Sequence, residues 1–87
     1  MTDYKVSVAR SARKSLDAMD RQECQRIITR LESLARNPRP PGCAKLEGAS
    51  HLWRIRVGSY RVVYEIDDTA RTVDVSIVRH RRDVYRF

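Results

Sequence analysis

The sequence predicts an α+β fold in which a helical hairpin packs on one face of a twisted, mainly antiparallel sheet. Three observations lead to this prediction. A segment near the N-terminus alternates apolar and polar residues, and the next two segments repeat apolar residues at three- and four-residue steps. The C-terminal half is rich in β-branched and aromatic residues. The expected order of elements is therefore β-α-α-β-β-β.

Residues 4–8, "YKVSV", are the expected first strand, because Tyr4, Val6 and Val8 alternate with polar residues. The first helix is expected over residues 11–19, "SARKSLDAM", with Ser11 as its N-cap. The second is expected over residues 20–37, where Asp20 and Glu23 form a variant capping box and the Asn37–Pro38 pair ends the helix. Its apolar face consists of Cys24, Ile27, Ile28, Leu31, Leu34 and Ala35. The short joint between the two helices predicts an antiparallel pair.

Three strands are expected after a loop at residues 37–51 that holds all three prolines: "LWRIRV" (52–57), "YRVVYEI" (60–66) and "TVDVSIVRH" (72–80). The Gly58–Ser59 pair between the first two predicts a two-residue hairpin turn, which sets Val57 opposite Tyr60. Counting outward, one face carries apolar and aromatic residues fit to cover the helices: Trp53, Ile55, Val57, Tyr60, Val62 and Tyr64. The other face carries Arg54, Arg56 and Arg61, with Arg56 directly opposite Arg61.

Like charges facing each other on a sheet destabilise the fold by about 0.2–1 kcal/mol per pair. Two interpretations of this arginine face remain open at this point. The side chains form a solvated outer surface with apolar stems, or they converge on an anion that the protein binds. The last strand and the tail after it add Arg79, Arg81, Arg82 and Arg86, together with His80 and Tyr85. An aromatic ring among guanidinium groups is the arrangement that holds single-stranded RNA, with a base on the ring and phosphates on the cations.

The overall charge also indicates a polyanionic partner. The net charge is +7, with 18 lysines and arginines against 11 acids. Lys5, Lys14 and Lys45 are the three lysines, so 18 minus three, or fifteen, of the cations are arginine, the side chain that suits phosphate. Nucleic acid is favoured over an acidic protein as the partner, although both can bind.

The 87 residues are expected to form one domain, 1–87, because this length leaves no room for a second core. No apolar run approaches the roughly 20 residues of a membrane span, and the start of the sequence lacks a signal-peptide layout. We therefore expect a cytoplasmic protein without membrane association. Cys24 and Cys43 have no metal-ligand spacing, so we expect neither a metal nor another cofactor. Reduced thiols are favoured over a disulfide between them.

The order of elements, with "KLEG", "LWRIRVGSYRVVYEID" and "VRHRRDVYR" in sequence, resembles the RelE/ParE toxin superfamily and in particular its RelE branch. The resemblance implies a small basic ribonuclease that enters the ribosomal A site, cuts mRNA there and is held inactive by a cognate antitoxin. It also implies the active-site residues. These are Arg54, Arg56, Arg61, Arg81 and Tyr85, with Arg82 as the alternative to Arg81. Further RNA contacts are expected from Lys45, Arg79, His80, Arg82 and Arg86.

The general base is the open question of this mechanism. Relatives often carry lysine where this chain has Arg54 and Arg56, and a guanidinium is effectively never deprotonated. Either catalysis rests on orientation and electrostatics, or His80 or a ribosomal group takes the proton.

Two alternatives to the nuclease remain: a ParE-like toxin that inhibits DNA gyrase through protein contacts, and a basic RNA-binding module without toxicity. The ParE-like branch typically lacks the full set of arginines and tyrosine, which is what favours the nuclease.

Overall fold

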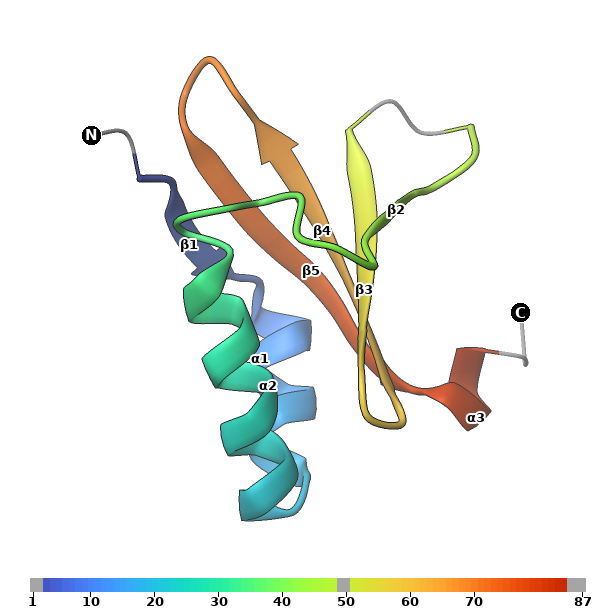
Figure 1. Ribbon diagram of the computed structural model, residues 1–87. Coiled ribbons are helices and arrows are strands. Elements are labelled where there is room, and N and C mark those ends of the chain that lie inside the picture. Colours follow the sequence, from blue (N-terminus) through green and yellow to red (C-terminus); the bar gives the residue numbers. More distant parts are fainter. Residues whose placement is uncertain (1–2, 49–50, 85–87) are drawn as a thin grey trace.

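Five strands form one mixed sheet in the order β1-β5-β4-β3-β2, in the computed structural model that describes residues 3–48 and 51–84 (Figure 1). The strands are β1 (Lys5–Val8), β2 (Ala44–Lys45), β3 (Leu52–Val57), β4 (Tyr60–Asp67) and β5 (Thr72–His80). β1 runs parallel to β5, and the other neighbours are antiparallel. The expected α+β fold with a mainly antiparallel sheet is confirmed, and β2 is an additional short edge strand.

Two longer helices, α1 (Arg10–Ala18) and α2 (Arg21–Ser33), cover one face of the sheet and run in opposite directions (Figure 1). Asp20 caps α2 as expected, because its carboxylate accepts a hydrogen bond from the Gln22 N–H. The expected Ser11 cap of α1 is wrong. That helix begins at Arg10, so Ser11 already lies within its first turn. The Ser11 hydroxyl donates instead to the carbonyl of Ser76 on β5. A third helix, α3 (Arg81–Val84), was not expected and follows β5 directly.

The core lies between the helices and the sheet. It consists of Ala12, Leu16, Ile27, Leu31 and Leu34 from the helical side and of Ile55, Val57, Val62, Tyr64, Ile66, Val73, Val75 and Val78 from the sheet. The predicted β3–β4 register is confirmed at every pair from Val57↔Tyr60 to Trp53↔Tyr64. Gly58 in the turn adopts a φ of 59°, a left-handed conformation that glycine accepts at little cost.

The register of β4 with β5 changes in the middle of the pair. Tyr64 lies opposite Val75, whereas Val63 lies opposite Ile77, so that Ser76 is an extra residue on β5. This is a β-bulge, and the Ser76 hydroxyl donates to the Val63 carbonyl at 3.2 Å beside it. The bulge decides which side chains of the second half of β5 face away from the helices.

A polar cluster joins the loop after α2 to the turn between β4 and β5. Arg39 donates two hydrogen bonds to Asp68, at 3.2 and 2.9 Å, and the Tyr4 hydroxyl donates a third at 2.5 Å. The bonds from Arg39 and then from Tyr4 lower the pKa of Asp68 to about 2. The Arg39 guanidinium also lies 4.9 Å from the centre of the Trp53 ring, which is a cation–π contact. These contacts hold the loop against the end of the sheet opposite the β3–β4 turn.

Tyr64 holds the same loop from inside the core. Its hydroxyl donates to the Pro38 carbonyl at 2.7 Å, and burial raises the pKa of the phenol above its usual range. The phenol therefore remains a hydrogen-bond donor.

Within the described part of the chain, no helix is long and apolar enough to cross a membrane.

Candidate nucleic-acid interface

Three arginines stand side by side on the face of the sheet that α1 and α2 leave uncovered. Arg56 on β3 pairs with Arg61 on β4, and Arg61 pairs on its other side with Arg79 on β5. Neighbouring strands lie about 4.8 Å apart, so the three side chains leave the sheet in one line across the strands. We call this set of three the arginine row. It lies near the β3–β4 turn, and the structure thus brings together Arg56 and Arg61, as expected, and places Arg79 beside them.

The charge on this face changes along the strands. Two residues along the strands from the arginine row, the residues that lie opposite one another are Arg54, Val63 and Ile77. Two residues further along β3 and β4, they are Leu52, Glu65 and Asp74. Arg54 therefore shares the face of the row but lies one line away. Because residues two apart along a strand are separated by about 6.6 Å, positive and negative ends of this face are roughly 13 Å apart. A polyanion is attracted to the arginine end and repelled from the carboxylate end.

Arg61 occupies the middle of the row and is half-buried. Its Nε is buried, and it is the one such side-chain nitrogen or oxygen in the described residues that has no hydrogen-bond partner. A buried donor without a partner is unfavourable by about 1–3 kcal/mol. An anionic oxygen can accept this N–H only after the Arg61 side chain has shifted and brought Nε to the surface.

The chain after β5 lies next to the row. In Figure 1, α3 lies on the other side of the β3–β4 hairpin from α1 and α2. The Arg81 N–H donates to the carbonyl of Ser59 in the turn at 2.7 Å, and both Arg81 and Arg82 are exposed. Tyr85 and Arg86, which were expected to act on RNA, lie outside the described residues.

His80 and Lys45 are placed differently from the row. His80 pairs with Tyr60, and Lys45 pairs with Trp53, so both positions belong to the face that packs toward the helices. The His80 ring meets the Tyr60 ring edge to face, with centres 5.2 Å apart. Its Nδ1 accepts a hydrogen bond from the Arg82 N–H at 3.2 Å. A role for either residue in RNA binding stays a prediction.

Permanent cations and hydrogen-bond donors dominate the chemistry of this surface. Guanidinium groups bind phosphate oxygens in pairs and stabilise negative charge that grows during a reaction, but they cannot take up a proton. Among the described residues no three His, Cys, Asp or Glu side chains are grouped as metal ligands. The arrangement suits the holding and polarisation of a phosphodiester.

The inclusion of Arg79 in the row is what sequence reasoning missed. Arg79 was expected to contact RNA, but an unbroken count from the turn at residues 68–71 places it on the helix side of the sheet. The signal that could have revealed the bulge is weak: a serine within an apolar run, which allows a local bond to a neighbouring carbonyl.

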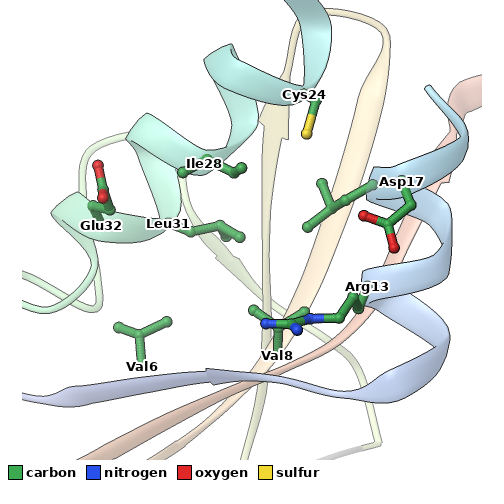
Figure 2. Close-up of a pocket in the computed structure, with 9 residues that line it drawn as sticks. Val6, Val8, Arg13, Asp17, Cys24, Ile28, Leu31 and Glu32 are labelled. Atoms are coloured by element: carbon green, nitrogen blue, oxygen red, sulfur yellow. The ribbon is translucent and has the colours of Figure 1, made fainter. Parts of the chain in front are cut away.

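A pocket of about 360 Å³ lies on the opposite side of the molecule, between β1, α1 and α2 (Figure 2). Its walls are mainly apolar, with Val6, Val8, Cys24 and Ile28 among them. Arg13, Asp17 and Glu32 stand at its edge. Cys24 and Cys43 are free thiols, as expected. The pocket presents no group of cations that would favour nucleic acid.

The family comparison matches almost the whole chain. The model of a family described as the ParE toxin of the type II toxin-antitoxin system parDE matches residues 6–85. A search of curated proteins gives no significant match.

Solved structures with the same fold include toxins in complex with their antitoxins. The archaeal RelE–RelB complex of Pyrococcus horikoshii OT3 is 27% identical with a TM-score of 0.82, over 93% of this chain and 97% of that chain. The toxin–antitoxin complex RelBE2 of Mycobacterium tuberculosis is 26% identical with a TM-score of 0.79, over 90% and 98% of the two chains. A mutant of the E. coli toxin RelE in the free state is 24% identical with a TM-score of 0.78, over 97% and 92%, and this likeness concerns the fold alone.

Proposed function

This chain belongs to the ParE toxin family and is the toxin of a type II toxin-antitoxin system with the RelE/ParE fold, and on that premise we propose that it is a ribosome-dependent endoribonuclease. The substrate is translated mRNA in the ribosomal A site. The arginine row carries the proposal, because its three residues lie directly opposite one another on adjacent strands and its central member has a buried Nε without a protein partner.

The proposed reaction is attack of an RNA 2′-hydroxyl oxygen on the adjacent phosphorus. The P–O5′ bond breaks, the 5′ oxygen leaves and takes up a proton, and the other fragment ends in a 2′,3′-cyclic phosphate. Arg61 is placed to bind the non-bridging oxygens, on which negative charge increases in the transition state. Arg54, Arg56 and Arg81 add positive charge from one side of the hairpin, and Tyr85 is the proposed base-stacking ring.

The proton of the 2′-hydroxyl has no acceptor in the arginine row. Nδ1 of His80 already accepts the Arg82 N–H, so this nitrogen is engaged by the backbone of α3 and does not face the substrate as a free acceptor. The engagement of Nδ1 favours a mechanism in which the protein orients the RNA and stabilises charge, and does not itself act as the general base. A ribosomal group is then the proposed proton acceptor. On this ground we propose that cleavage depends on the ribosome, and with it a cytoplasmic location.

The proposed partner in the resting cell is a cognate antitoxin, as in the RelE–RelB complexes of similar fold. A segment rich in carboxylates is expected to cover the arginine row, because it would neutralise the charges that attract RNA. Co-expression of a small acidic protein encoded beside this gene is expected to restore growth.

A second candidate function is inhibition of DNA gyrase, which is the activity expected of the ParE-like branch, and the matching family is described as the ParE toxin of parDE. The two functions are separated by two assays after induction of the chain: mapping of cuts within translated messages, and DNA supercoiling by purified gyrase. We expect cuts in codons occupied by ribosomes and unchanged supercoiling. We further expect Arg61→Ala to abolish both growth arrest and cleavage, whereas Arg36→Ala, a change of an exposed arginine outside this face, preserves both. Growth arrest by the Arg61→Ala variant would refute the nuclease.

A further inference from the structure

The junction between β5 and α3 is held by two hydrogen bonds from the first amides of the helix. The Arg81 N–H donates to Ser59 in the β3–β4 turn at 2.7 Å, and the Arg82 N–H donates to Nδ1 of His80 at 3.2 Å. A helix of four residues has almost no internal hydrogen bonds to stabilise it, so its position depends on contacts with its surroundings. These two bonds therefore determine where Arg81 and Arg82 lie.

The acceptor on His80 is itself held in place. The ring is half-buried and lies edge to face on Tyr60, with centres 5.2 Å apart and planes at 88°. His80 is the last residue of β5, where its backbone pairs with Tyr60 on β4. The imidazole thus acts like the asparagine or aspartate that ordinarily caps a helix, but it is fixed by packing against the sheet.

We propose that His80 is a positioning residue: its Nδ1 caps α3 and so places Arg81 and Arg82 beside the arginine row. The effect on RNA cleavage rests on the proposed nuclease function, whereas the capping itself does not. This role differs from direct contact with RNA and from proton transfer, because the ring acts on the backbone of α3 and not on the substrate.

Two substitutions separate the two contacts of the ring. His80→Asn keeps an acceptor oxygen at nearly the position of Nδ1 and removes the ring. His80→Phe keeps a ring against Tyr60 and removes the acceptor. His51→Phe, at an exposed position before β3, is the matched control. Urea unfolding of each variant first establishes that the fold is retained.

The direct measurement is the solvent-exchange rate of the Arg82 amide proton by NMR. We expect fast exchange in His80→Phe and wild-type exchange in His80→Asn and His51→Phe. In cleavage of ribosome-bound mRNA, His80→Phe is expected to lower kcat on the order of 10- to 100-fold with little change in KM, because Arg81 is misplaced. His80→Asn is expected to restore most of kcat.

Slow Arg82 exchange in the His80→Phe variant would overturn the proposal. So would loss of cleavage in His80→Asn while the Arg82 amide stays protected, because the imidazole would then act on RNA itself. If the wild-type chain cuts no mRNA at all, the nuclease function fails, and the exchange rates still decide whether His80 caps α3.

Discussion

Arg61 on β4 lies opposite Arg79 on β5, although an unbroken count from the turn between these strands would place Val78 there. The difference is the single extra residue of the bulge, Ser76. Because successive side chains of a strand point to opposite faces, a shift of one residue moves the whole second half of β5 to the other face. Val78 thereby enters the core, and Arg79 joins the arginine row.

The first prediction concerns Ser76. Ser76→Ala removes the hydroxyl that donates to the Val63 carbonyl and is expected to lower the free energy of unfolding by about 0.5–1.5 kcal/mol, as measured by urea denaturation. Ser15→Ala is the control, since the Ser15 hydroxyl bonds only within its own helix to the Ser11 carbonyl. Equal stability of wild type and Ser76→Ala would show that the bulge does not depend on this bond.

A second prediction separates function from stability. Arg56→Thr relieves the repulsion between Arg56 and Arg61 and introduces a β-branched residue, so the free energy of unfolding is expected to rise by about 0.2–1 kcal/mol. The same change is expected to lower the cleavage rate by roughly 10²–10³, as expected for loss of one transition-state donor. Arg36→Thr should alter neither quantity. A less stable Arg56→Thr protein with full activity would contradict both parts.

A third prediction concerns the salt dependence of RNA binding. Each phosphate contact on a single strand contributes about −0.7 to the slope of log K against log salt concentration. Arg61→Gln is expected to make the slope shallower by about this amount, measured by fluorescence anisotropy with a labelled single-stranded RNA. Lys14→Gln, on the exposed side of α1, is expected to keep the wild-type slope. An unchanged slope for Arg61→Gln would exclude Arg61 from the phosphate contacts.

A fourth prediction is the acid sensitivity of the Asp68 cluster. The pKa of Asp68 is lowered in the folded protein to about 2, so the unfolded chain binds the proton more readily. The contribution of this carboxylate to stability is complete above pH about 4 and is lost as the pH falls toward 2. The pair with Arg39 is largely exposed, which keeps the contribution small. The urea midpoint of Asp68→Asn should therefore approach that of wild type as the pH is lowered toward 2. A difference between the two midpoints that stays constant from pH 7 to pH 2 would contradict this prediction.

The β3–β4 hairpin was predictable to the level of single pairs, because a two-residue turn determines the register of both strands. The second half of β5 was not, since the bulge depends on a local bond between Ser76 and Val63 that no hydrophobic pattern encodes. Likewise α3 depends on acceptors at Ser59 and His80, and the first of these is distant in sequence. Sequence reasoning thus found the arginines on β3 and β4 and counted Arg79 among the RNA contacts, but it did not find that Arg79 lies directly opposite Arg61.

The pairing of β1 with β5 joins residues that are far apart along the chain, as the hydrogen bond between Ser7 and Asp74 across 67 positions illustrates. During synthesis the earliest strand therefore has no neighbour until the latest one has left the exit tunnel. Arg79 emerges at the same late moment. The arginine row is therefore complete only after β5 has left the tunnel and has paired with β4.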